Sequence, residues 1–159
     1  MMNEAGKPTD EAIDEAVRED AEKAIEDAAE DVAEEPVREV YGHELIVDLH
    51  NCSTEKFNRE GIKTFMDKLC SLIDMEQEAL HFWDFEDEEE YNAQPPHLKG
   101  TSAVQFIKTS DIVIHALDDM KRVYLNIFSC KKFNNVIALA FIADYFEGEA
   151  IHSSFIERD

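Results

Sequence analysis

The chain has 159 residues, which suits one domain with an appendage, and its formal net charge is −22. Such an acidic surface repels phosphate groups, so neither nucleic acid nor an anionic membrane is an expected partner. No apolar run reaches the roughly 20 residues that span a bilayer. The start lacks the pattern of a signal peptide, and three cysteines without metal-site spacing favour reduced thiols, so we expect a cytoplasmic protein without a metal.

Residues 1–38 differ in composition from the rest of the chain. They are rich in Ala, Glu and Asp, contain no aromatic residue, and carry only a thin apolar stripe at helical spacing. A lone helix with so little to bury is marginal in water. We therefore expect an acidic tail, disordered or frayed helical, ahead of a domain that covers residues 39–159.

The first half of this domain predicts two strands around one helix. The sequence "HELIVDL" at 43–49 alternates between apolar and polar residues, as a half-buried strand does. "NCST" then offers caps for an amphipathic helix from about 54 to 73. A second strand is expected at 79–85, followed by a long polar loop at 86–100 that contains two prolines and a glycine.

The second half predicts three strands, a helix and a last strand. The strands are expected at 102–107, 111–117 and 121–129, and a largely buried helix at 134–148 ends at a glycine. The last strand is expected at 149–156. This order predicts an α+β fold: a two-layer sandwich of an antiparallel β-sheet with two helices on one face.

Three polar residues interrupt the apolar strands of this second half, namely Ser110, His115 and Cys130. The turn "LDDMKR" could return Cys130 to the end of the sheet where Ser110 lies, which would bring a hydroxyl, an imidazole and a thiol together. Such a set can activate a nucleophile and deliver a proton. The alternative is plain packing, because free cysteines are commonly buried and strand histidines often only hydrogen-bond in place. A hydrolase is disfavoured, since no G-x-S-x-G turn is present.

The segment "GTSAVQFIKTSDIVIHALDDMKRVYLNIFSC" resembles the prokaryotic S-adenosylmethionine decarboxylase family. A Gly-x-Ser, a cleavage serine, an Ile-His and a Phe-x-Cys match the family in order and without a gap, and give Ser102, Ser110, His115 and Cys130. "YGHELIVDLHNC" is similar to the first strand of the family. The resemblance spans about residues 41 to 157.

The resemblance implies a decarboxylase that cleaves itself between Thr109 and Ser110. The cleavage turns Ser110 into a pyruvoyl cofactor, with His115 and Ser102 assisting the attack on the peptide. The ketone of the cofactor would form a Schiff base with the substrate, and Cys130 would return a proton after CO₂ leaves. The implied function is decarboxylation of S-adenosylmethionine in polyamine (spermidine) biosynthesis, by a homodimer or higher homo-oligomer of processed chains.

The chain departs from the family at two places. The cleavage site reads Thr109-Ser110-Asp111 where Glu-Ser-His is usual, and Leu117 replaces a tryptophan that stacks on adenine. Asp119 replaces a glutamate that holds the ribose, and it could still accept ribose hydroxyls. Two alternatives therefore stay open. One is a pyruvoyl-dependent arginine or ornithine decarboxylase, and the other is an uncleaved, inactive homologue that regulates a decarboxylase.

Overall fold

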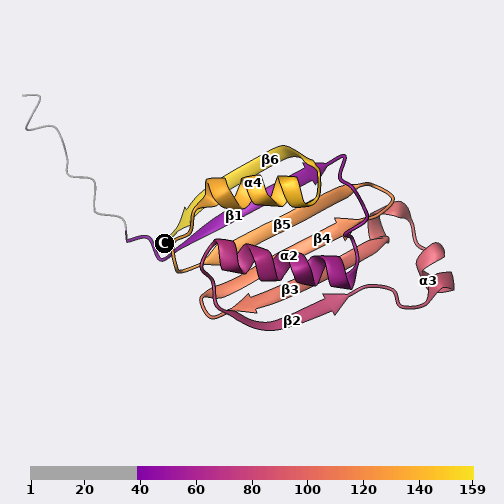
Figure 1. The fold of residues 1–159 in the computed structure, drawn as a ribbon, viewed down its shortest axis with the longest axis horizontal. Coiled ribbons are helices and arrows are strands. Elements are labelled where there is room, and N and C mark those ends of the chain that lie inside the picture. The colour runs from indigo at the N-terminus through magenta and orange to yellow at the C-terminus, as the bar shows by residue number, and fades with distance from the viewer. Residues whose placement is uncertain (1–38) are drawn as a thin grey trace, which may run out of the picture. The chain divides into compact units, whose positions relative to one another are not determined.

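The computed structural model describes residues 39–159, and the prediction of an acidic tail lies outside this range. A six-stranded sheet with the order β2-β3-β4-β5-β1-β6 forms its centre, and every neighbouring pair is antiparallel (Figure 1). The elements in chain order are β1 Gly42–His50, α2 Arg59–Leu72, β2 Gln77–Trp83, α3 Glu88–Asn92, a 3₁₀ turn Pro96–Leu98, β3 Gly100–Ile107, β4 Ser110–Leu117, β5 Arg122–Ser129, α4 Asn135–Tyr145 and β6 Glu149–Arg158.

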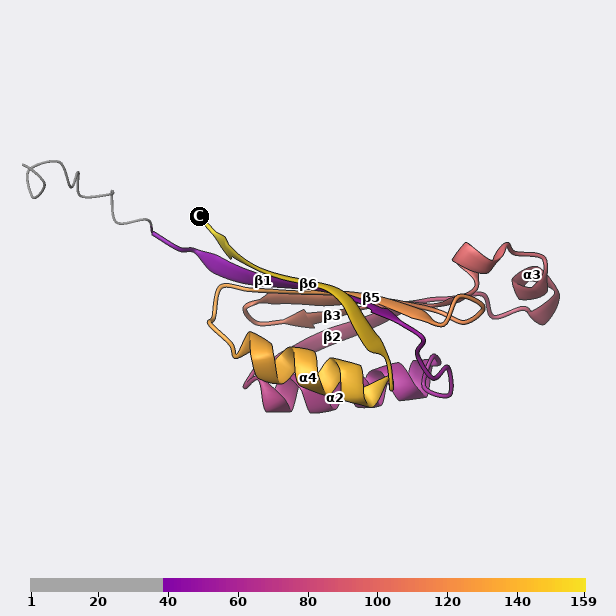
Figure 2. The ribbon, with the colours of Figure 1, turned by 90° about the horizontal axis from the view of Figure 1, so that it is seen from above.

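The two long helices, α2 and α4, lie on the same face of the sheet (Figure 2). Alternation along the strands points one set of side chains at these helices, for example Val123, Leu125 and Ile127 of β5, which are all buried. Phe65 of α2 and Phe146, the C-cap residue of α4, meet with ring centroids 4.8 Å apart and fill the space between the layers. The predicted two-layer α+β sandwich is confirmed. No described element covers the opposite face of the sheet, hereafter the bare face.

Helix α2 begins later than the sequence pattern predicts. Its N-cap is Asn58, whose side-chain oxygen accepts from the Gly61 backbone N–H at 2.9 Å. The "NCST" segment instead hydrogen-bonds to two other parts of the domain, because the N–H groups of Cys52 and Ser53 donate to the carbonyls of Lys121 and Phe146. The prediction of a helix starting near residue 54 is therefore wrong by about one turn.

The polar stretch 86–100 is more ordered than a plain loop. Asp87 caps the short helix α3 by accepting from the Glu90 N–H at 2.8 Å. The Tyr91 hydroxyl then donates to the Asp118 carboxylate at 2.7 Å, which ties α3 to the turn after β4. The absence of apolar periodicity concealed this helix, because capping and a single tyrosine hold it rather than a buried face.

Gly100 fixes how closely β3 approaches β4. Its φ is +151°, and a Cβ at this position would lie 1.9 Å from the carbonyl oxygen of Ala116. Only glycine allows the two backbones to approach this closely. The register that follows sets Ser102 opposite His115 and Ile107 opposite Ser110. Among residues 39–159, no helix has the length and apolar character needed to cross a membrane.

Candidate active site

The Thr109–Ser110 peptide lies at the exit of the tight turn between β3 and β4. Ile107 and Ser110 are the last paired residues of the two strands, so only Lys108 and Thr109 form the turn. Ser110 has φ +151°, a conformation that residues with a side chain rarely adopt. Backbone strain of this kind costs roughly 1–3 kcal/mol and is concentrated at functional sites. The predicted scissile bond is thus next to a strained residue.

The carbonyl of Thr109 receives a hydrogen bond from β5. The register of β4 on β5 sets Ser110 opposite Ser129, and the next backbone N–H, that of Cys130, donates to the Thr109 carbonyl oxygen at 3.2 Å. A backbone N–H aimed at a carbonyl stabilises negative charge that develops on this oxygen during attack. The Cys130 thiol is exposed at the same end of the sheet. One chain therefore brings Thr109, Ser110 and Cys130 together.

A buried serine that the sequence analysis missed holds the Thr109 side chain. The Ser129 hydroxyl donates to Thr109 Oγ1 at 2.9 Å and accepts from the Lys131 N–H at 3.0 Å. Thr109 Oγ1 in turn lies 3.4 Å from Met75 Sδ, to which it donates. Ser129 is fully buried, and only the strand register could have indicated its place beside the turn.

Asp111 is the acidic residue nearest the predicted nucleophile along the chain. The Ser110 hydroxyl donates a long hydrogen bond of 3.4 Å to Asp111 Oδ2. This distance is well beyond that of an ordinary O–H···O hydrogen bond, so Asp111 orients the hydroxyl only weakly and does not replace an imidazole as its proton carrier.

His115 lies at the opposite end of β4 from Ser110. Five residues of extended strand separate them by roughly 17 Å. Its Nδ1 is 2.5 Å from the Ser102 hydroxyl across the β3–β4 ladder. The expectation that one chain gathers the Ser110 hydroxyl, the His115 imidazole and the Cys130 thiol is wrong, because the register places His115 opposite Tyr124 and Ser110 opposite Ser129.

Two aromatic residues flank the Ser102–His115 pair on the bare face. The ladders align Trp83, Ser102, His115 and Tyr124 across β2, β3, β4 and β5, so their side chains share one face. A mostly apolar hollow of about 160 Å³ is lined by Trp83 and Ser102, together with His81, Phe82, Ala103, Val104 and Val113. Trp83 is 56% exposed. The arrangement offers an apolar hollow beside the Ser102–His115 pair.

The two positions that the family resemblance links to adenosine binding already contact other parts of the protein. Leu117 is buried, with 3% of its surface exposed. The Asp119 carboxylate forms an ion pair with the Lys99 ammonium at 3.3 Å. Asp119 would have to leave or share this partner in order to accept hydroxyl groups of a substrate.

Burial shifts the titration of the groups that could carry protons. It lowers the pKa of His115 below the ordinary value of 6.5, so the imidazole is neutral near pH 7 and able to accept a proton. It raises the pKa of the Cys52 and Cys70 thiols to about 11, which makes them poor nucleophiles. No three His, Cys, Asp or Glu residues between 39 and 159 are placed to hold a metal ion.

Comparison with known proteins gives one family and one fold. A family model described as S-adenosylmethionine decarboxylase matches residues 43–159. The fold is similar to the crystal structure of the adenosylmethionine decarboxylase from Aquifex aeolicus, with a TM-score of 0.61 and 17% sequence identity over 76% of this chain and 92% of that chain. The search of curated proteins finds no match.

The depressed pKa of His115 is directly measurable. We expect NMR titration of the His115 ring to give a midpoint below 6.5, because the half-buried site disfavours the imidazolium. The folded state then binds fewer protons than the unfolded state, so this group lowers stability as the pH falls through 6.5 towards the folded pKa. The loss should be smaller in His115→Gln, measured by urea unfolding between pH 7 and 5. A midpoint at or above 6.5 would contradict the assignment.

Proposed function

Since the chain belongs to the S-adenosylmethionine decarboxylase family, we propose that it is a self-cleaving, pyruvoyl-dependent decarboxylase. We assign S-adenosylmethionine as its first substrate, within polyamine (spermidine) biosynthesis. The observation that carries the proposal is the geometry at Thr109–Ser110. The strained φ of Ser110 and the Cys130 N–H on the Thr109 carbonyl favour attack at this peptide over an ordinary, inert turn.

The cleavage uses only groups of the chain and water. The Ser110 Oγ bonds to the Thr109 carbonyl carbon, the C–N bond breaks, and the hydroxyl proton ends on the freed nitrogen, which gives an ester. A base then removes the Cα proton of residue 110, the Cβ–Oγ bond breaks, and the Thr109 carboxylate departs. The remaining enamine takes up water and releases ammonia, so that residues 110–159 begin with a ketone. The strain at Ser110 is relieved in the first of these steps.

The pyruvoyl group would supply a ketone that accepts the electron pair released when CO₂ leaves the substrate. The chain fits this chemistry at the same end of the sheet. The Cys130 thiol is exposed there, within one residue of the Ser129 that pairs with Ser110, and it can return a proton to the substrate carbon.

We propose that the Ser102–His115 pair of one copy acts on the Thr109–Ser110 turn of a second copy. Within one chain the pair lies roughly 17 Å along β4 from Ser110, which is beyond the reach of a proton transfer. Alternation along β3 and β4 puts both residues on the bare face of the sheet, together with the exposed Phe106 and Val113. Two copies packed through this face in a two-fold arrangement would each offer a proton carrier to the other's turn.

We assign Trp83 as the aromatic residue that stacks on the adenine of an adenosyl substrate. It is the cross-strand partner of Ser102, it is exposed, and it lines the apolar hollow. Stacking of a base on an aromatic ring is worth about 1–3 kcal/mol. Trp83 could therefore take over the part that the buried Leu117 cannot play.

One observation favours a second candidate, a decarboxylase of arginine or ornithine. Leu117 is buried and Asp119 is paired with Lys99, so neither of the two expected adenosyl-binding positions is free for the substrate. In that case Trp83 would have no substrate ring to stack on.

The first prediction concerns the integrity of the chain. We expect mass spectrometry of the purified protein to find residues 1–109 and residues 110–159, the latter with a pyruvoyl group in place of serine. Ser110→Ala removes the attacking oxygen and should leave one folded, full-length chain. Cys130→Ala should still be cleaved but lose turnover, because its proton is needed only after CO₂ has left. A wild-type chain that stays whole after long incubation would favour the inactive homologue.

The second prediction separates action within one chain from action between two copies. Ser110→Ala lacks the nucleophile and His115→Ala lacks the proton carrier, so neither should be cleaved when expressed alone. When the two are co-expressed with different tags, only the His115→Ala chain should be cut, because its partner supplies the imidazole. Gel analysis of each tag reads the result. If neither chain is cut on co-expression, His115 acts within its own chain, and cleavage of His115→Ala expressed alone would show that the imidazole is not required.

The third prediction concerns the substrate. If Trp83 stacks on adenine, Trp83→Ala should raise the KM for S-adenosylmethionine by about five- to 100-fold with little change in kcat, and Trp83→Phe should recover most of the loss. Release of CO₂ from S-adenosylmethionine, arginine and ornithine is compared at equal concentrations. A preference for arginine or ornithine that survives Trp83→Ala would establish the second candidate.

A further inference from the structure

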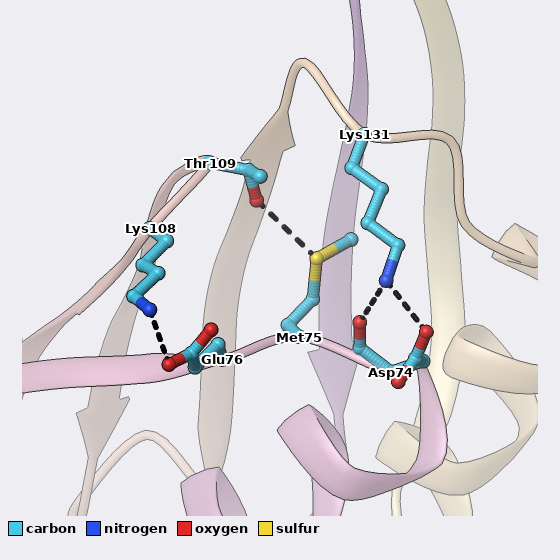
Figure 3. A pocket seen from close by; sticks show the side chains of 6 residues that line it. All are labelled: Asp74, Met75, Glu76, Lys108, Thr109 and Lys131. Atoms are coloured by element: carbon cyan, nitrogen blue, oxygen red, sulfur yellow. Dashed lines mark hydrogen bonds and ion pairs between the residues drawn. The ribbon is translucent and has the colours of Figure 1, made fainter.

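A cavity of about 510 Å³ lies beside Thr109, at the turn between β3 and β4 (Figure 3). It is lined by two ammonium groups, two carboxylates, a thioether and the turn itself: Lys108, Lys131, Asp74, Glu76, Met75 and Thr109. Apart from Thr109 and Met75, none of these residues contributes a side chain to the candidate active site described above. Its charged residues line the same cavity as Thr109, whose peptide bond to Ser110 the proposed function breaks.

Both ammonium groups are held by carboxylates that water reaches easily. Lys131 Nζ lies 2.6 Å from Asp74 Oδ2 and also donates to the Asp74 backbone carbonyl at 2.5 Å. Lys108 forms an ion pair with Glu76. The side chain of Asp74 is 93% exposed and that of Glu76 is 66% exposed. Ion pairs of this kind contribute little to stability and can exchange partners at small cost.

Thr109 differs from these carboxylates because it is only half exposed. Thr109 is held from both sides, by the Ser129 hydroxyl and by Met75, so its carbonyl carbon cannot swing into water without breaking these contacts. A carboxylate formed at this place would be partly desolvated. Partly desolvated carboxylates require a nearby positive charge.

We infer that this cavity is the binding site for the carboxylate that self-cleavage creates at Thr109, with Lys131 as its principal counter-ion and Lys108 as the second. The inference rests on the proposed self-cleavage. Lys131 leaves the exposed Asp74 and pairs with the new C-terminus of the 1–109 fragment. The ligand class is therefore a carboxylate supplied by the chain's own backbone.

The negative charge on the Thr109 carboxyl group appears only in the elimination step. The shift of the Thr109 acyl group from nitrogen to Ser110 Oγ yields a neutral ester. In the following elimination the Cα proton of residue 110 goes to a base, its electron pair forms the Cα–Cβ double bond, and the Cβ–Oγ bond breaks. The electrons of that bond stay on Oγ, which departs as part of the Thr109 carboxylate. An ammonium group beside this oxygen stabilises the leaving group and speeds the elimination.

The test compares two variants that break the same ion pair. Lys131→Met removes the counter-ion of the leaving carboxylate, whereas Asp74→Asn frees Lys131 to act. The chains are made by cell-free synthesis, and samples are taken over time with and without neutral hydroxylamine. Hydroxylamine cuts the ester to give a Thr109 hydroxamate and an N-terminal serine at 110, and elimination gives a Thr109 carboxylate and a pyruvoyl group. Mass spectrometry distinguishes the two pairs of products.

We expect the ester to accumulate in Lys131→Met, with elimination slowed about tenfold or more. Asp74→Asn should eliminate at least as fast as wild type. Lys131→Arg should recover most of the rate, and Lys132→Met, which makes the same charge change one residue outside the cavity, should behave as wild type. Thermal unfolding of each full-length chain, carrying Ser110→Ala in addition, reports whether it folds.

Two results would overturn the inference, and they differ. If wild type is cleaved while Lys131→Met and Asp74→Asn slow cleavage alike without accumulating ester, the Lys131–Asp74 pair only clamps the turn and the inference fails although the proposed function stands. If wild type is never cleaved, the proposed function fails and the inference fails with it.

Discussion

Two hydrogen-bonded ladders, β3 on β4 and β4 on β5, decide which polar side chains of this protein meet. They are set by close backbone contacts rather than by the polar groups themselves, since Gly100 lets β3 approach the Ala116 carbonyl and a two-residue turn follows Ile107. A shift by one residue would move each side chain to the opposite face. The hydrogen bond from Cys130 to Thr109 and the contact of Ser102 with His115 would then both be lost.

The sequence was informative where periodicity or a motif carries the structure. Alternation predicted the first strand, and apolar, strand-forming segments predicted the other five. The capped apolar segments predicted both long helices, with the start of α2 misplaced because Asn58 and not the earlier polar run forms the cap. The short helix α3 gave no signal, since it buries no side chain. The polar residues that interrupt the apolar strands gave Ser110, His115 and Cys130 as candidates and the family resemblance added Ser102, but their grouping depends on register. For the same reason Ser129 and Met75, which hold Thr109 from elements far apart in the sequence, could not be found before the structure.

The separation of Ser110 from His115 along β4 has a physical meaning of its own. Under the proposed function the strained residue beside the polarised carbonyl is the nucleophile, yet the neutral imidazole that could accept its proton stands at the other end of the strand. A single folded chain under the proposed function would therefore be latent. The bare face of the sheet, with Phe106 and Val113 exposed to water, is the surface whose burial would end this latency. Activity would then depend on protein concentration during assembly, as in any process of second order.

The order of the strands decides what a cut in the turn after β3 would do to the molecule. Residues up to Thr109 contribute β1, α2, β2 and β3, and residues from Ser110 contribute β4, β5, α4 and β6. Strand β1 lies between β5 and β6, while β3 lies against β4, so the two pieces are interleaved through three ladders and a shared core. A severed chain of this kind cannot come apart by a hinge motion, because separation requires the sheet itself to unzip. The two polypeptides would unfold as one body and would be told apart only after denaturation.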